Sequence, residues 1–208
     1  MNIGIIGAGS LGRALGKRLT DVGHEVMFGG DVSAADAASE IGAKAGSNRD
    51  AAAFGDIVVL AVPFAAIAAA LSAAEPLAGK MLWSCVNALK PDFSGLAIGF
   101  DTSAAEEVAK LAPGAHVVGA IPPFAEALAS GDLHYDGELT PTVFICSDDD
   151  RAKAAVEELV LEIGGHPVDA GPLSAARLIE PAMMLIVSIA YADLPRDVGL
   201  RMLERSQR

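Results

Sequence analysis

The sequence predicts an α/β fold in which a mainly parallel sheet is covered by helices on both faces. Short apolar runs rich in β-branched residues alternate almost throughout with longer runs of helical periodicity. This alternation is typical of a doubly wound parallel sheet. The chain has 208 residues, of which 52% are hydrophobic and only 5% aromatic. That composition suits a single compact unit in which small residues let helices pack closely on strands.

Strands are predicted where a run is short, apolar and rich in β-branched residues. These runs are 2–6, 24–28, 56–62, 81–86, 116–121 and 142–146. Two further short strands are expected at 43–46 and 167–170, where the alternation of strands and helices leaves room for them. Residues 57–74 include no charged side chain and are long enough to suggest a membrane span. Pro63 divides them into a β-branched half and an Ala-rich half, so a buried strand, a turn and a helix are expected instead.

Helices are predicted where apolar residues recur with helical periodicity. These segments are 10–22, 34–41, 64–74, 103–111, 124–129, 149–163 and 174–191. Ser47 and Asn48 are predicted to form a turn. Residues 181–190 are apolar on all sides, so we expect the core, a ligand or a second copy of the chain to bury this helix on several sides. Arg177 and Glu180 are expected to pair with each other on its surface.

A glycine-rich segment follows the first predicted strand and opens the first predicted helix. It reads Gly-Ala-Gly-Ser-Leu-Gly from Gly7 to Gly12, which matches the dinucleotide-binding pattern Gly-x-Gly-x-x-Gly. Gly7 permits a tight turn, Gly9 lets the backbone approach a diphosphate, and Gly12 lets the helix pack against the strand. The free N–H groups and the dipole at the helix start favour the diphosphate. The alternative is a glycine turn that holds no ligand.

The fold class is therefore predicted to be α/β of the Rossmann type, doubly wound, with a small C-terminal helical lobe. Residues 1–170 are expected to form the NAD(P)-binding domain. Residues 171–208 are expected to pack on it as a helical segment, so that the chain forms a single compact unit.

The residues after the second predicted strand bear on the choice between NAD and NADP. Asp31 lies nineteen residues after Gly12, next to Gly30. An acidic side chain at this distance accepts hydrogen bonds from the adenosine ribose and would repel a 2′-phosphate. No Arg or Lys follows until Lys44. The residues alone therefore favour NAD, and the alternative is that Asp31 is a solvated turn residue.

Ligands of open α/β sheets bind beyond the carboxyl ends of the strands. Val62 and Pro63 lie at one such end and could form the wall of a nicotinamide site. Asn87 follows another and offers an amide to a ribose or a carboxamide, unless it only forms a turn. The residues expected to contact the dinucleotide are Gly7, Ala8, Gly9, Ser10, Leu11, Gly12, Gly30, Asp31, Ala61, Val62, Pro63, Asn87, Ala88 and Ile121.

Candidates for acid–base chemistry are few. His134 lies in a polar connector with Tyr135 and Asp136 and is a weak candidate for a proton donor, the alternative being a solvated loop residue. This scarcity favours a hydride acceptor with its own redox chemistry, such as a flavin or deazaflavin, which needs positioning more than proton transfer. No spacing of Cys, His or acidic residues suits a metal site, and none is expected.

Charge and cysteine content narrow the partners. The 15 Lys and Arg residues against 27 Asp and Glu give a net charge of −12, which argues against binding nucleic acid or anionic membranes. Cys85 and Cys146 lie in apolar runs and are expected to be buried, reduced thiols. Together with an N-terminus unlike a signal peptide, they indicate a cytoplasmic protein. A small molecule or redox cofactor is the expected partner, and a homodimer through the C-terminal helix is one expected assembly.

The chain resembles the F420-dependent NADP oxidoreductases, also called NADPH:F420 reductases, which are related to the oxidoreductase domain of metalloreductases. The resemblance covers nearly the whole chain. The matching segments are 3–9, 23–26, 61–64, 92–99, 103–109, 168–173, 176–177 and 180–181. It implies hydride exchange between nicotinamide and a deazaflavin, coenzyme F420, in a cleft between the Rossmann domain and the C-terminal lobe. Residues implied to hold the nucleotide are Gly7, Ser10, Leu11, Val62, Pro63 and Asn87.

Three segments differ from the family pattern. A Ser-Arg pair that binds the 2′-phosphate in the family falls on Gly30 and Asp31. The family's Asn-Pro is here Asn87 followed by Ala88, and residues 121–124 replace a Phe-Asn-Thr-like segment on the substrate side. The resemblance therefore favours NADP, whereas the residue at position 31 favours NAD.

The predicted function is that of an NAD(P)-dependent oxidoreductase that transfers a hydride between nicotinamide and a redox cofactor or small organic acceptor. One alternative is a reductase of a small carbonyl or imine, like the pyrroline-carboxylate and ketopantoate reductases. Those enzymes carry larger helical C-terminal domains, whereas about 35 residues follow Leu173 here. The other alternative, suggested by the scarcity of catalytic groups, is a dinucleotide-binding sensor without turnover.

Overall fold

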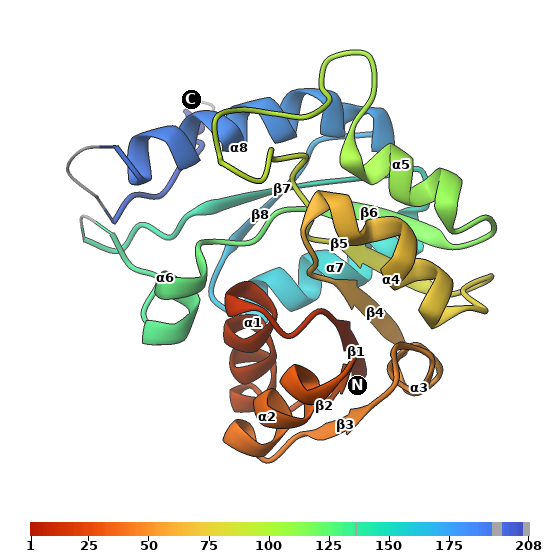
Figure 1. Cartoon of the computed structure of the whole chain (residues 1–208). Helices are drawn as coiled ribbons and strands as arrows, with labels where there is room; N and C mark the ends of the chain where they lie inside the picture. The colour runs from red at the N-terminus through yellow and green to blue at the C-terminus, as the bar shows by residue number, and fades with distance from the viewer. Residues whose placement is uncertain (136, 193–196, 206–208) are drawn as a thin grey trace.

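A computed structural model describes residues 1–135, 137–192 and 197–205 of the chain. They form an eight-stranded sheet in the order β3-β2-β1-β4-β5-β6-β7-β8, with helices on both faces (Figure 1). The strands are β1 (Asn2–Ile6), β2 (Glu25–Gly29), β3 (Lys44–Gly46), β4 (Ile57–Leu60), β5 (Met81–Ser84), β6 (His116–Ala120), β7 (Thr142–Ser147) and β8 (His166–Asp169). The predicted α/β class and all eight predicted strands are confirmed.

One strand pair departs from the parallel pattern. β7 runs antiparallel to β6, with Ala120 opposite Ile145 and Val118 opposite Ser147, while the other neighbouring pairs are parallel. The first residue of β7, Thr142, therefore lies at the same edge of the sheet as the carboxyl ends of β1, β4, β5 and β6. This edge is where the ligand site was predicted.

The helices largely follow the prediction. They are α1 (Ser10–Asp21), α2 (Val32–Ile41), α3 (Asn48–Phe54), α4 (Ile67–Ala74), α5 (Ala104–Leu111), α6 (Ala125–Ser130), α7 (Asp150–Glu162) and α8 (Ala176–Ala190), with short 3₁₀ turns at Phe64–Ala66 and Leu173–Ala175. The turn predicted at Ser47 and Asn48 is wrong, because these residues begin α3. Ser47 and Asp50 form a reciprocal capping box there. Serine is common both in turns and at helix starts, so the sequence signal was ambiguous.

The core consists of two layers, one on each face of the sheet. Successive residues of β4 alternate between them, with Ile57 and Val59 in one layer and Val58 and Leu60 in the other. The first layer packs under α1, α2, α6 and α7, and the second under α3, α4, α5 and α8. Residues 57–74 form β4, a 3₁₀ turn and α4, as predicted.

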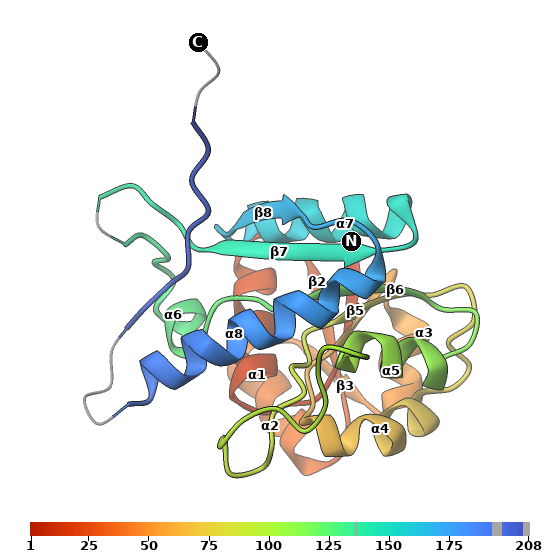
Figure 2. The same cartoon turned by 90° about the horizontal axis from the view of Figure 1, so that it is seen from above.

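The last helix is less buried than its apolar sequence predicts. α8 runs from the neighbourhood of α5 toward α6 (Figures 1 and 2), and only 28% of the residues 173–190 are buried. Leu178 and Leu185 are 72% and 60% exposed. This span is long and apolar enough to cross a membrane by length and composition, with a mean hydropathy of 1.6. The chain's own core therefore covers only part of the helix, and burial of the rest by a ligand or by a second copy stays a prediction.

Candidate active site

The loop between β1 and α1 has the backbone geometry of a dinucleotide-binding turn. Gly7 has a φ of +110°, and a Cβ atom on it would collide with the backbone of Ala61. A Cβ atom on Gly12 would collide with the carbonyl group of Gly7. Gly9 caps α1 and has open space where a side chain would be. The loop thus combines close packing on the protein side with an open approach for a ligand.

Asp31 begins α2 beyond the end of β2. Its Oδ1 accepts hydrogen bonds from the Ser33 backbone N–H at 3.1 Å and from the Ser33 hydroxyl at 2.9 Å. These hydrogen bonds lower the pKa of Asp31, so its carboxylate is charged at neutral pH. Asp31 therefore serves as a helix cap and also places a negative charge at the surface beside Gly30.

Arg13 joins the glycine loop to the start of α2. Its Nε donates to the Ala8 carbonyl and its Nη2 to the Ser33 carbonyl, both at 3.0 Å. Its Nη1 lies 2.6 Å from a carboxylate oxygen of Glu40. Sequence reasoning missed this role. Because Glu40 balances its charge, Arg13 is already paired and does not offer a free cation to a 2′-phosphate.

A cavity of about 690 Å³ lies at the predicted edge of the sheet. This volume is within the usual range for small-molecule sites. Among the fourteen predicted contact residues, those that line it are Ser10, Leu11, Val62, Pro63, Asn87 and Ile121. They come from the segments that follow β1, β4, β5 and β6. The predicted residues outside the cavity lining are Gly7, Ala8, Gly9, Gly12, Gly30, Asp31, Ala61 and Ala88.

Asn87 carries a polar atom without a partner where the cavity meets β5. Its Nδ2 donates to the backbone carbonyl of Glu180 at 3.3 Å. Its Oδ1 is buried and has no hydrogen-bond partner among the described residues. A buried acceptor without a donor costs about 1–3 kcal/mol. A ligand hydroxyl or amide would remove that cost, so the residues present fit the ribose or carboxamide of a nicotinamide nucleotide.

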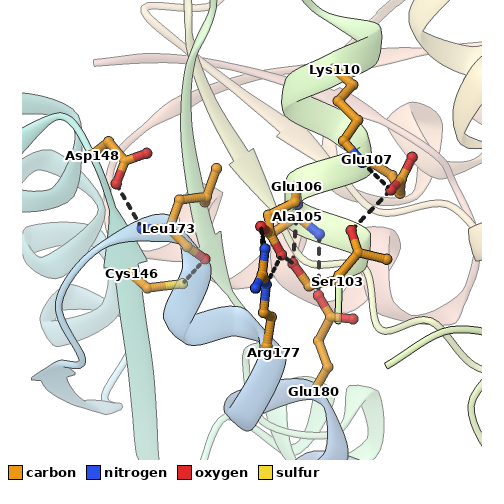
Figure 3. Close-up of polar contacts among 11 residues, drawn as sticks. Ser103, Ala105, Glu106, Glu107, Lys110, Cys146, Asp148, Leu173, Arg177 and Glu180 are labelled. Carbon is orange, nitrogen blue, oxygen red and sulfur yellow. Dashed lines mark hydrogen bonds and ion pairs between the residues drawn. The ribbon is translucent and has the colours of Figure 1, made fainter. Parts of the chain in front are cut away.

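Two charged residues of α8 fix this helix to α5 (Figure 3). The Glu180 carboxylate accepts the backbone N–H groups of Ala104 at 2.9 Å and Ala105 at 3.1 Å. Arg177 binds the Glu106 carboxylate through Nε at 2.9 Å and Nη2 at 2.7 Å. The predicted pairing of Arg177 with Glu180 is wrong, because each reaches α5 instead. Burial raises the pKa of Glu180 to about 7, although the N–H groups that it accepts act in the opposite direction.

The connector before β7 brings Tyr135, and not His134, to the cavity. Tyr135 lines it, and its hydroxyl donates to Asp197 at 2.8 Å. The His134 side chain is half exposed and hydrogen bonds to Asp132 at 2.8 Å. Asp136 lies outside the described residues. The proton-donor role of His134 stays a prediction.

Much of the remaining lining comes from the C-terminal part of the chain. These residues are Met183, Ile186, Val187, Tyr191, Val198, Gly199 and Leu200. Sequence reasoning missed them because apolar residues that line a cavity look like core residues. The one available signal was that α8 is apolar on all sides. A bound ligand was one of the groups expected to bury it.

The cavity offers few charged groups. Lys90 and Glu126 are charged residues of its lining. Among the described residues, no cluster of three or more His, Cys, Asp or Glu side chains could hold a metal ion. Cys85 and Cys146 are free and buried, as predicted, and burial raises the pKa of the Cys146 thiol to about 12. Hydride transfer without a protein nucleophile suits such a site.

The comparisons with known proteins agree with the geometry. Residues 2–88 match the family model described as "NADP oxidoreductase coenzyme F420-dependent". The F420-dependent NADP reductase of Methanothermobacter marburgensis is 31% identical over 221 residues, which cover 97% of each protein. The chain belongs to this family. The predicted family and the predicted enzyme class, an NAD(P)-dependent oxidoreductase, are thereby confirmed.

Solved structures support the fold of this family member. A protein from Arthrobacter sp., provisionally named an F420-dependent NADP-reductase, is 27% identical, with a TM-score of 0.84 over 97% of this chain and 99% of that one. An imine reductase from Pseudomonas sp. is 18% identical, with a TM-score of 0.68 over 91% of this chain and 62% of that one. The second likeness shows the fold alone, and confirms its Rossmann type.

Proposed function

We propose that the protein exchanges a hydride between a nicotinamide dinucleotide and a deazaflavin of the coenzyme F420 type, the activity named for its relatives. The buried, unpaired Oδ1 of Asn87 carries this proposal. Asn87 lines the same cavity as Ser10 and Leu11 of the glycine loop, which suits a diphosphate, and the apolar walls of this cavity suit a flat ring. A dinucleotide that extends from the glycine loop to Asn87 would place its nicotinamide at Asn87, next to Val62 and Pro63.

In this proposal the chain's own residues bind and orient the two cofactors and exclude water from the space between them. When both are bound, the nicotinamide would supply a hydride from its C4 atom and the acceptor ring would take up this hydride and one proton from the solvent, so the redox chemistry would come from the two cofactors. The Asn87 oxygen orients the nicotinamide side by accepting a hydrogen bond. Apolar side chains such as Val62, Ile121 and Met183 keep water from the space between the two rings. Close placement of the rings supplies most of the rate.

For the dinucleotide, we propose NADP(H), which the relatives' names include, with weak discrimination against NAD(H). The glycine loop holds the diphosphate, and Gly30 and Asp31 face the adenosine end. The charged Asp31 opposes a 2′-phosphate, and Arg13 is occupied by Glu40. Both features lower the preference for NADP(H) that a Ser-Arg pair would give.

A titration followed by an acceptor screen tests the function. NADPH and NADH are titrated into the protein by nicotinamide fluorescence, and the tighter one is then mixed with coenzyme F420, a flavin, a quinone and a cyclic imine. Turnover with F420 above the others is the expected result. Faster imine reduction would favour the carbonyl or imine reductase. Binding without turnover of any acceptor would favour the sensor, and no dinucleotide binding would overturn the proposal.

We also propose that the protein acts in the cytoplasm as a homodimer, without binding membranes or nucleic acid. Leu178, Leu185 and Ile189 are exposed at spacings of seven and four residues, so they share one side of α8. A second copy of this helix would offer an apolar partner for these side chains. The net charge of −12 argues against binding to nucleic acid and to anionic membranes. The attachment of α8 to α5 argues against insertion of α8 into a membrane.

The division of the chain follows the same proposal. Residues 1–170 would be the NAD(P)-binding domain, since β8 ends at Asp169. Residues 171–208 would supply the lobe that covers the acceptor. Leu173 and Ile179 support a single compact unit, because they belong to the same buried layer as Val58 of β4.

A further inference from the structure

The described residues of the C-terminal tail bind along the start of β7. The Leu200 carbonyl accepts from the Thr142 N–H at 2.6 Å, and the Met202 N–H donates to the Thr142 hydroxyl at 2.9 Å. Arg201 donates through Nη1 to the Thr140 carbonyl at 3.0 Å. We call residues 197–202 the C-terminal strap.

The strap has a defined position because the N-terminal end of β7 extends beyond its ladder with β6. The ladder between β6 and β7 ends at the pair Ala120 and Ile145, three residues short of Thr142. On its other side β7 pairs with β8, where Thr142 lies opposite His166. The strap therefore takes the backbone position that β6 leaves at the edge of the sheet.

Tyr135, which lies in the connector before β7, holds the strap in place through Asp197. Its hydroxyl donates to Oδ1 of Asp197 at 2.8 Å. Burial and the Asp197 charge raise the pKa of Tyr135 to about 12, so the phenol keeps the proton that it donates. The Tyr135 ring lies against Gly199, where a Cβ atom would come within 3.3 Å of Cε2. Glycine at this position therefore lets the ring and the strap approach each other closely.

The strap lines the cavity at the start of β7, which three strands of the sheet separate from β1 and its glycine loop. Val198, Gly199 and Leu200 share this cavity with Tyr135 and Thr142. Along the part of the sheet order that borders the cavity, β1 with its glycine loop is followed by β4, β5 and β6 and then by β7. A dinucleotide that extends from the loop to Asn87 would leave the β6–β7 end for the second reactant.

We propose that the C-terminal strap is the outer wall of the acceptor site and that Leu200 limits the size of the ring that this site takes. The inference rests on the proposed function, because it assigns the β6–β7 end of the cavity to the hydride acceptor. The walls here are apolar, including Val198 and Leu200 from the strap and Met183 and Ile186 from α8. The acceptor buried between them is accordingly a flat, uncharged ring, with charged substituents left outside.

Leu200→Trp tests the wall by narrowing it, and Leu203→Trp is its matched control. Leu203 is 74% exposed in the same tail and does not line the cavity. The measurements are kcat and KM for a tricyclic deazaflavin, together with the Kd of NADPH. Leu200→Trp is expected to raise the deazaflavin KM about tenfold with an unchanged NADPH Kd, whereas Leu203→Trp changes neither.

Leu200→Ala and Tyr135→Phe keep the inference testable if the tryptophan variant fails to fold. Both are expected to raise the deazaflavin KM several-fold, by widening the wall or by releasing the strap at Asp197, again without changing the NADPH Kd. If the Leu200 and Leu203 variants are active and have equal KM values for the deazaflavin, the proposed role of the strap is overturned and the proposed function still stands. An unmodified protein that binds NADPH but reduces no acceptor would overturn the proposed function, and the strap's role with it.

Discussion

At the scale of single residues, the unpaired oxygen of Asn87 connects structure to dinucleotide binding. Asn87→Ala removes the acceptor that a bound nicotinamide nucleotide would use, while the free protein loses only one 3.3 Å hydrogen bond to Glu180. The Kd for the dinucleotide is expected to rise about tenfold, or about 1.4 kcal/mol. Asn48→Ala is the control, because the Asn48 amide also donates one 3.3 Å hydrogen bond to a backbone carbonyl but lies outside the cavity lining. Equal affinities in the two variants would show that Asn87 does not contact the nucleotide.

Asp31 combines a charge and a helix cap, and two substitutions separate these roles. Asp31→Arg replaces the charge that opposes a 2′-phosphate and should raise the NADPH/NADH ratio of kcat/KM about tenfold or more. Asp31→Asn keeps a side-chain acceptor for Ser33 but removes the charge, so it should shift the same ratio less. Steady-state kinetics with both dinucleotides measure the ratio. If the ratio stays constant in both variants, Asp31 does not face the ribose.

At the scale of elements, Glu180 couples α8 to α5 through a buried carboxylate. Its pKa is about 7 in the folded protein and 4.5 in the unfolded chain, so the folded state binds more protons between these values. Stability from this group is therefore present at low pH and decreases as pH rises toward 7.

Glu180→Gln should flatten this pH dependence. The melting temperature of the unmodified protein is expected to fall more between about pH 5 and about pH 8 than that of the variant, which carries no titrating group there. Histidines are common to both proteins and cancel in the comparison. Parallel melting profiles would mean that Glu180 titrates normally.

The same elements show what the sequence can predict. Most of the eight strands are short apolar runs, so periodicity finds them. The exceptions are β3 (Lys44–Gly46) and β8 (His166–Asp169), which are short and partly polar, and the alternation of strands and helices indicated them instead. The direction of β7 is set by pairing with β6, and no residue within Thr142–Ser147 encodes it. α8 carries an apolar stripe on two sides, one at the cavity and one exposed, and composition does not distinguish either from a core contact.

At the scale of the whole molecule, the two ends of the site differ in how far the sequence predicts them. The proposed dinucleotide end depends on a local motif, Gly7 to Gly12, and on residues that directly follow strands. The proposed acceptor end joins Tyr135, α8 and the strap, which line one cavity beside the start of the antiparallel strand β7. Long-range contacts of this kind leave no spacing in the sequence to recognise.

The exposed side of α8 is the proposed contact between two copies of the chain. Leu185 is 60% exposed on this helix, and Leu161 is 60% exposed on α7, where it serves as a matched control. Leu185→Glu places a charge in the proposed interface and should convert the dimer to a monomer in sedimentation equilibrium. Leu161→Glu should leave the dimer intact, because a surface charge away from an interface changes stability by only about 0.5 kcal/mol. The homodimer proposal is excluded if the unmodified protein sediments as a monomer, and its interface is misplaced if both variants dissociate alike.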